Sequence, residues 1–250
     1  MSAPTSPTTT ETGAVRALVF DVFGTVVDWR GSIIKEGEAM TAAKGWRVDW
    51  PAFADAWRAC YQPSMQRAMQ AAASDPAAWL KLDVLHRATL ETLLPRFGLD
   101  RLSAAERDHL NFVWHRLDPW PDAVAGLARL KARAPIATLS NGNVSLLVDM
   151  ARHAGLPWDC VLSAELFRKY KPHPDVYRGA ADLLGVAPGE LLMVAAHPSD
   201  LAAAARAGLK TAYVDRPLEL GPEGAREDPA GQRFDWVARD FVDLAAQIGA

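Results

Sequence analysis

The sequence contains little of what marks secreted, membrane-spanning or nucleic-acid-binding proteins. It has only two cysteines, Cys60 and Cys160, which lie far apart and have no partners at metal-ligand spacing. We therefore expect reduced thiols and a cytoplasmic protein. No apolar run approaches the roughly 18 residues that a membrane-spanning helix needs. The net charge is only -3 over 250 residues, with both signs mixed, so we expect neither a nucleic-acid nor a membrane partner.

The chain begins with a segment unlike the rest. Residues 1–13 are rich in Pro, Thr and Ser and have neither the basic nor the apolar part of a secretory signal. We predict a disordered tail there. Over the whole chain 50% of the residues are hydrophobic, which is enough for a sizeable core in one or two domains.

Four helical patterns follow one another with no strand pattern between them. They predict helices over residues 31–45, 49–73, 77–97 and 103–117. Ser103 and Glu106 have capping-box spacing at the start of the fourth. This block predicts a separate helical subdomain, a four-helix cap over residues 31–117.

Outside this block, strand and helix patterns alternate. A buried strand over residues 17–20 comes before the helical block, and further strands are expected at 135–139, 160–163, 191–196 and 211–214. Helices of about ten residues between them favour a parallel sheet with right-handed crossovers. We therefore expect an α/β fold with a Rossmann-like core, formed by residues 14–30 and 118–250, into which the helical cap is inserted.

Polar side chains follow the ends of several predicted strands. Asp21 and Thr25 follow the first strand, and Ser140 and Asn141 follow the second. The others are Lys171, His197 and Asp200. Each is weak evidence alone, since Asp21 also fits a surface turn and Ser140-Asn141-Gly142 a plain loop. Because the carboxyl ends of parallel strands meet at one edge, we expect one site there.

These segments resemble the haloacid dehalogenase superfamily and, within it, the L-2-haloacid dehalogenases. The matching stretches are FDVFGTVVD (20–28), LSNGN (139–143), YKPHPDVY (170–177) and AAHPSDLAAAARAGLKTAYVDRP (195–217). The resemblance implies a Rossmann-like core with a helical cap. It also implies a hydrolase that converts short L-2-haloacids to D-2-hydroxyacids through an ester on Asp21.

The residue at position 23, Phe23, distinguishes the expected dehalogenase from a phosphatase of the same superfamily. The resemblance implies that a phosphatase has a second Asp there, which protonates a leaving alcohol, whereas a departing halide needs no proton. Phosphatases also bind Mg²⁺ through acidic residues after the last motif, and Mg²⁺ prefers carboxylate oxygens. Here only Asp200 remains in that stretch. We therefore expect neither a metal nor a cofactor, with a phosphatase or a catalytically silent binding protein as alternatives.

The resemblance implies a role for each of the other site residues. Thr25 orients Asp21, while Lys171 compensates the buried carboxylates. Ser140 and Asn141 bind the substrate carboxylate, and Tyr177 supports Lys171. Water is activated by Asp200 or by Lys171, a choice that stays open.

The halide site is less certain from the sequence. The resemblance places the halide-binding arginine at Arg58, with Arg30 as a rival and Trp57, Tyr61 and Trp79 as candidate walls. Ala195, His197 and Ser199 depart from the family pattern. His197 stands where an Asn helps to hold halide, so it either replaces that Asn or points elsewhere. A smaller halide site would also accept fluoroacetate. The expected partners are therefore a 2-haloacid and halide, with a homodimer expected only from the resemblance.

Overall fold

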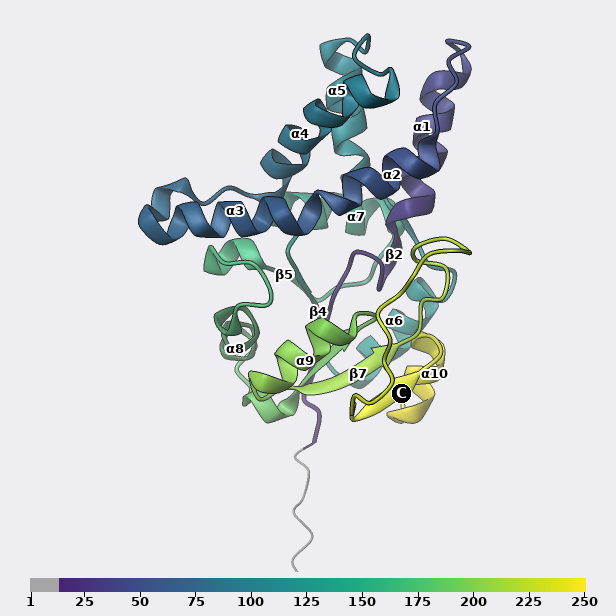
Figure 1. Ribbon diagram of the computed structural model, residues 1–250. Helices are drawn as coiled ribbons and strands as arrows, with labels where there is room; N and C mark the ends of the chain where they lie inside the picture. Colours follow the sequence, from purple (N-terminus) through teal and green to yellow (C-terminus); the bar gives the residue numbers. More distant parts are fainter. Residues whose placement is uncertain (1–13) are drawn as a thin grey trace, which may run out of the picture.

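A six-stranded parallel sheet organises the computed structural model, which describes residues 14–250 (Figure 1). The predicted tail, residues 1–13, lies outside the described residues. The strand order is β5-β4-β1-β6-β7-β8. The strands are β1 (Ala17–Phe20), β4 (Ile136–Ser140), β5 (Cys160–Ser163), β6 (Leu191–Ala195), β7 (Lys210–Val214) and β8 (Trp236–Ala238).

Strand β1 lies at the point where the strand order changes direction. It pairs with β4 on one side and β6 on the other, so that Leu18 faces both Ile136 and Leu192. All four of its residues are buried, as its continuous apolar sequence predicts. Ligands of such sheets bind beyond the carboxyl end of the strand at this switch point. The residue at that place is Asp21.

Five helices connect or follow the strands of the sheet region. They are α6 (Ala123–Arg133), α7 (Val144–Ala154), α8 (Pro174–Leu183), α9 (Pro198–Arg206) and α10 (Phe241–Gln247). The predicted alternation of strand and helix is confirmed. Only β8 was not expected, because a three-residue edge strand after a polar segment has too short a pattern to detect.

A helical insertion separates β1 from the rest of the sheet region. The chain leaves and returns through two short antiparallel strands, β2 (Val27–Asp28) and β3 (Asp118–Pro119). Between them lie α1 (Trp29–Ala42), α2 (Trp50–Ala59), α3 (Tyr61–Ser74), α4 (Leu82–Leu93) and α5 (Ala104–Asn111). Short 3-10 turns lie at Pro76–Ala78, Leu94–Phe97 and Phe112–His115. Figure 1 shows α2 and α3 running across the top of the sheet region.

The insertion therefore contains five α-helices, and the prediction of four was wrong at one place. The pattern read as a single helix over residues 49–73 is divided at Cys60. Pro63 explains the division, because proline has no N–H to donate and its ring clashes with the carbonyl four residues earlier. It is tolerated only in the first turn of a new helix, here α3. The capping box of Ser103 and Glu106 is confirmed.

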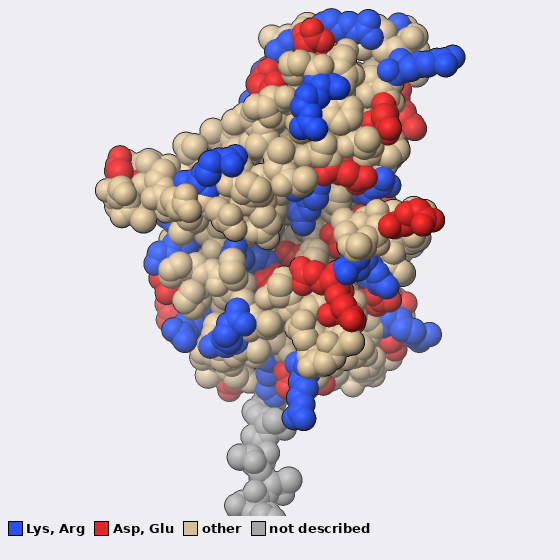
Figure 2. Space-filling view, in the orientation of Figure 1, with Lys and Arg blue, Asp and Glu red and all other residues tan. Residues whose placement is uncertain are grey.

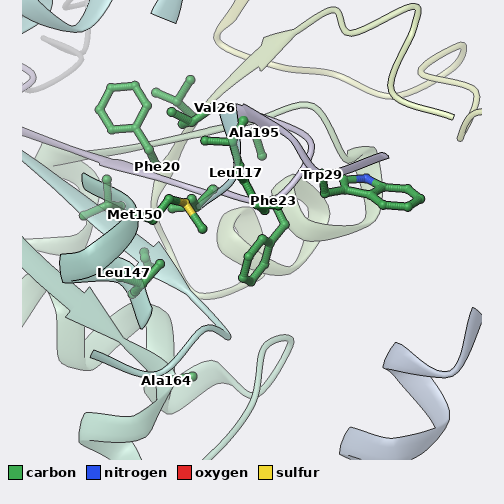
Figure 3. Packing of buried hydrophobic residues seen from close by; sticks show 14 of the residues in the cluster. Phe20, Phe23, Val26, Trp29, Leu117, Leu147, Met150, Ala164 and Ala195 are labelled. Atoms are coloured by element: carbon green, nitrogen blue, oxygen red, sulfur yellow. The ribbon is translucent and has the colours of Figure 1, made fainter. Parts of the chain in front are cut away.

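Aromatic side chains join the insertion to the sheet region. Phe23 lies just after β1, and its ring packs edge-on against Trp114 of the insertion at 5.6 Å between centroids. Trp57 packs on the same indole at 5.4 Å. Figure 3 shows Phe23 among the buried apolar side chains near Trp29. Each such aromatic pair adds about 0.5–1.5 kcal/mol beyond its buried area, so the two parts share one core.

The surface agrees with the charge pattern of the sequence. Figure 2 shows acidic and basic side chains interspersed over the visible face. Among the helices of residues 14–250, none is long and apolar enough to cross a membrane.

Candidate active site

Asp21, Lys171 and Asp200 form the centre of the site. The Lys171 ammonium lies 2.9 Å from Asp21 Oδ1 and 2.5 Å from Asp200 Oδ2. Asp21 and Lys171 are only 7% and 8% exposed. Burial opposes ionisation of Asp21, but the charge of Lys171 and the hydrogen bond from His197 more than offset it and lower its pKa. Asp21 is therefore held as a buried, paired carboxylate.

The second oxygen of Asp21 is held by Thr25. The Thr25 hydroxyl donates to Asp21 Oδ2 at 2.8 Å and accepts from the backbone N–H of Ala196 at 3.0 Å. Because the backbone N–H of Ala196 donates to the Thr25 hydroxyl, the proton of that hydroxyl is directed at Asp21. The predicted orienting contact of Thr25 is present.

Asp200 lies in the first turn of α9, and its position is set from α8. The Tyr177 hydroxyl donates to Asp200 Oδ1 at 2.5 Å. Burial and the neighbouring carboxylate of Asp200 both raise the pKa of Tyr177, so it remains a neutral donor. Tyr177 thus contacts Asp200, which in turn pairs with Lys171.

His197 lies between two carboxylates at the start of α9. Its Nδ1 is 3.1 Å from Asp21 Oδ2, and its Nε2 is 3.0 Å from Glu219 Oε1. Burial lowers the pKa of the imidazole, but the two carboxylates outweigh burial and raise it to about 10. His197 is therefore a cation at neutral pH, and both of its ring nitrogens are occupied.

Glu219 is a site residue that sequence reasoning missed. Its carboxylate is buried and also accepts a hydrogen bond from Trp29 Nε1 at 3.1 Å. A Cβ at Gly24, whose φ is +83°, would lie 2.0 Å from Glu219 Oε1. Glycine at this position therefore serves both the turn after β1 and the close approach of Glu219. No motif marks Glu219, because it lies in a polar, Gly/Pro-rich segment and reaches the site only through the fold.

A cavity of about 380 Å³ opens beside Asp21 between the sheet region and the insertion. Predicted residues that line it are Asp21, Phe23, Arg58, Tyr61, Asn141, Lys171, Tyr177, His197 and Asp200. Ser199, noted as a departure from the family pattern, lines it too, and Gln62, Gln66, Arg206 and Glu227 line it without having been predicted. Side chains from the segments after β1, β4, β5 and β6 therefore line one cavity.

Arg58 and Arg30 have different surroundings. The Arg58 guanidinium lies 4.3 Å from the centre of the Tyr61 ring, and its Nη1 is buried without a hydrogen-bond partner among residues 14–250. Arg30 instead makes a two-pronged ion pair with Asp55 at 2.7 and 3.0 Å and does not line this cavity. Of the two arginines, Arg58 is thus the one that lines the cavity and has a buried donor left for an anion.

The remaining predicted residues have mixed positions. Asn141 lines the cavity, while its Oδ1 accepts from the backbone N–H of Lys171 at 2.8 Å. Ser140 is fully buried and does not line the cavity; its Oγ accepts from the N–H of Gly142 at 3.1 Å. Trp57 lies in the core, and Trp79 stacks on Tyr170 outside the cavity, so neither forms its wall.

The donor set does not suit a metal ion. The ammonium of Lys171 lies between Asp21 and Asp200, the two carboxylates that a cation would need. Phe23, where a further acid would stand, is packed against Trp114. Within residues 14–250, no group of three or more His, Cys, Asp or Glu side chains is arranged to hold a metal.

A sequence profile of haloacid dehalogenase-like hydrolases matches residues 15–208. The chain belongs to this family. It is 31% identical to (S)-2-haloacid dehalogenase 4A of Burkholderia cepacia over 209 residues, which cover 81% of this chain and 84% of that one. It is thus a member of the L-2-haloacid dehalogenases.

Two solved structures add to this relationship. A defluorinating L-2-haloacid dehalogenase is 46% identical, with a TM-score of 0.87 over 94% of this chain and 96% of that one. The L-2-haloacid dehalogenase of Xanthobacter autotrophicus with chloropropionic acid covalently bound is 26% identical. Its TM-score is 0.77, over 94% of this chain and 99% of that one. The fold predicted from the motifs is confirmed.

Proposed function

We infer that this member of the haloacid dehalogenase-like hydrolases is an (S)-2-haloacid dehalogenase, which hydrolyses short L-2-haloacids to D-2-hydroxyacids. The observation that carries the inference is the ionised Asp21 at the floor of a cavity whose other charged groups include Lys171 and Arg58. The similarity to L-2-haloacid dehalogenases supports it. The phosphatase alternative is disfavoured by Phe23, which can transfer no proton.

The first step we propose is nucleophilic displacement by Asp21. An oxygen of its carboxylate attacks C2 of the haloacid from the side opposite the halogen. The carbon–halogen bond breaks, halide leaves with the bonding electrons, and an ester joins Asp21 to the inverted carbon. A carboxylate is a weak nucleophile, so much of the rate comes from alignment, which supplies up to roughly 7–11 kcal/mol. The covalent chloropropionic acid in the Xanthobacter relative supports this step.

The second step is hydrolysis of that ester. Water attacks the Asp21 carboxyl carbon, and the 2-hydroxyacid leaves with the original Asp21 oxygen. Asp200 is held by Tyr177 and Lys171 at 2.5 Å each, which suits it to orient and deprotonate the water. Lys171 is less suited as base, because Asp200 and Asp21 together outweigh burial and raise its pKa. We therefore assign water activation to Asp200.

Arg58 is the proposed halide ligand. Its buried, unpartnered Nη1 offers a charged donor to the departing anion, which needs stabilisation as the bond breaks. Arg30 is already neutralised by Asp55. We assign the substrate carboxylate to Asn141 and the backbone N–H groups after Asp21, while Ser140 supports this loop through Gly142.

Fluoroacetate is a proposed further substrate. The 46% identity to a defluorinating L-2-haloacid dehalogenase supports it, as does the buried charged donor of Arg58 beside the cavity. Fluoride is small and accepts strong hydrogen bonds, so its departure depends on charged donors near the reacting carbon.

The test is halide release from separate enantiomers. We expect chloride and D-lactate from (S)-2-chloropropionate, no turnover of (R)-2-chloropropionate, and slower fluoride release from fluoroacetate. Mg²⁺-dependent hydrolysis of p-nitrophenyl phosphate without halide release would overturn the assignment. Release of chloride without release of fluoride would contradict the proposal that fluoroacetate is a substrate, but not the assignment as a 2-haloacid dehalogenase.

Three further proposals concern the whole chain. We propose a core of residues 14–30 and 118–250 with a cap of residues 31–117, supported by the β2–β3 stem. The free thiols of Cys60 and Cys160 support a cytoplasmic location. The homodimer expected from the resemblance is tested by the mass of the protein in sedimentation equilibrium.

A further inference from the structure

The two ring nitrogens of His197 both face carboxylates. Nδ1 lies 3.1 Å from Asp21 Oδ2, and Nε2 lies 3.0 and 3.1 Å from the two oxygens of Glu219. An ionised carboxylate only accepts hydrogen bonds, so each ring nitrogen must carry a proton. His197 is therefore a doubly protonated imidazolium, and neither of its N–H groups is left to bind a halide. His197 accordingly does not take over the halide contact that the family pattern assigns to the Asn at its position.

The two oxygens of Asp21 are held unequally. Oδ2 accepts from Thr25 at 2.8 Å and from His197 at 3.1 Å, whereas Oδ1, within the described part of the chain, is paired with Lys171 at 2.9 Å. An oxygen that accepts two hydrogen bonds has less electron density available for attack on carbon. The free lone pairs therefore belong to Oδ1, and Oδ2 keeps its donors whether it is part of a carboxylate or of an ester carbonyl.

We propose that Glu219 is a positioning residue that holds His197 charged and aimed at Asp21, so that His197 and Thr25 form an oxyanion hole on Oδ2. The proposal rests on the ester mechanism given above and assigns a role to its second step. Oδ1 attacks C2 and becomes the ester oxygen, while Oδ2 becomes the ester carbonyl.

The charges balance through both steps. When Oδ1 forms its bond to C2, the halide takes the electron pair and the Asp21 charge is lost. When water attacks the carboxyl carbon, the carbonyl electrons move onto Oδ2, and the charge there is stabilised by the N–H of His197 and the hydroxyl of Thr25. Asp200 takes the first proton of the water as it attacks. Collapse breaks the bond to Oδ1, the leaving hydroxyacid oxygen takes that proton from Asp200, and the second proton of the water is released to solvent, which leaves Asp21 a carboxylate again.

Glu219 is held independently of His197. Trp29 donates to Oε1, and the absence of a Cβ at Gly24 leaves room for the carboxylate. Further charged groups near His197 are Arg58 and Glu227, which line the same cavity, and the Lys171–Asp200 pair beyond Asp21. Arg216 and Arg226 line a neighbouring pocket together with His197 and Glu219. Of these, the carboxylates of Asp21 and Glu219 are the ones in contact with the imidazole.

The test is Glu219→Gln, which keeps the size of the side chain and an oxygen for Trp29. A neutral imidazole donates a weaker hydrogen bond than a charged one, so we expect ester hydrolysis about 10- to 100-fold slower. Ester formation should change far less. In rapid-quench experiments with (S)-2-chloropropionate, the variant should release a single equivalent of chloride per site in a burst and accumulate the ester on the peptide that carries Asp21.

The matched control is Glu36→Gln, which makes the same substitution in a half-buried ion pair with Arg116 in the insertion. It should keep wild-type rates. If Glu219→Gln instead slows the chloride burst itself and alters the ratio of chloride to bromide release, then His197 acts on the halide and the proposal is wrong.

A measurement without turnover separates this proposal from the assigned activity. Histidine ¹⁵N chemical shifts should report a doubly protonated His197 at pH 8 in the wild type and a neutral ring in Glu219→Gln. A neutral ring in the wild type would overturn the proposal even if the enzyme is a dehalogenase. A charged ring in a protein without halide release from any 2-haloacid would instead overturn the function.

Discussion

The charged state of His197 makes the stability of the protein depend on pH in a predictable direction. In the unfolded chain a histidine loses its proton near pH 6.5, whereas in the folded protein the pKa of His197 is raised to about 10. The folded state therefore binds one more proton between these values. The resulting stabilisation is fully present below pH 6.5 and is lost as pH rises through 10.

The size of this effect follows from proton linkage. With one extra proton in the folded state, the free energy of unfolding falls by about 1.4 kcal/mol for each pH unit. From pH 7 to pH 9 this amounts to roughly 2–3 kcal/mol, a large part of a typical stability of about 5–15 kcal/mol. Asp21, whose pKa is lowered, loses its stabilisation only in acid and does not contribute in this window.

Urea denaturation at pH 7, 8 and 9 measures the effect, with His197→Asn as the reference protein. The pKa of His115 is raised by Asp83 and Asp149 against the effect of burial, and it titrates in both proteins and cancels in the comparison. We expect the wild type to lose about 1.4 kcal/mol more per pH unit than the variant. Equal slopes for the two proteins would refute a charged His197 between two carboxylates.

Four substitutions test the assigned roles. Asp21→Asn should abolish turnover while the far-UV circular dichroism stays unchanged. Hydroxyacid formation by this variant at the wild-type rate would show that Asp21 is not the nucleophile. Arg58→Ala should slow halide release without unfolding the protein, whereas Arg30→Ala should not; the reverse result would move the halide site to Arg30. Tyr177→Phe removes a hydrogen bond to a charged group, worth about 1.5–3 kcal/mol, and should slow ester hydrolysis roughly tenfold or more. Unchanged single-turnover hydrolysis would show that Asp200 needs no support from Tyr177.

The part of the fold that follows local patterns was predictable from the sequence. Strand β1 is a short apolar run that is followed directly by a carboxylate, and α7 ends at Gly155, a glycine that adopts the left-handed conformation typical of helix ends. The division at Cys60 was missed because both neighbouring helices are amphipathic, although Pro63 carried the signal.

The candidate site was predictable where its residues stand at strand ends. Asp21 directly follows β1, and Asn141 directly follows β4. Lys171 lies eight residues after β5, beyond the 3-10 turn Ala164–Phe167, and that connection returns it to Asp21. Glu219 was not predictable, because its contact with His197 depends on how the segment after β7 folds back over the site. Likewise, the sequence favoured Arg58 but left Arg30 as a rival. The ion pair of Arg30 with Asp55, the unpaired Nη1 of Arg58 and the place of Arg58 in the cavity lining distinguish them.

The most direct test of the account is hydrolysis of (S)-2-chloropropionate in H₂¹⁸O. With enzyme in excess, a single turnover should give D-lactate whose new hydroxyl is unlabelled, because that oxygen comes from Asp21. After many turnovers with substrate in excess, mass spectrometry should find heavy oxygen in the Asp21 side chain. Labelled lactate in the single turnover, with Asp21 unlabelled after repeated catalysis, would mean that water attacks the substrate directly and that no ester forms on Asp21.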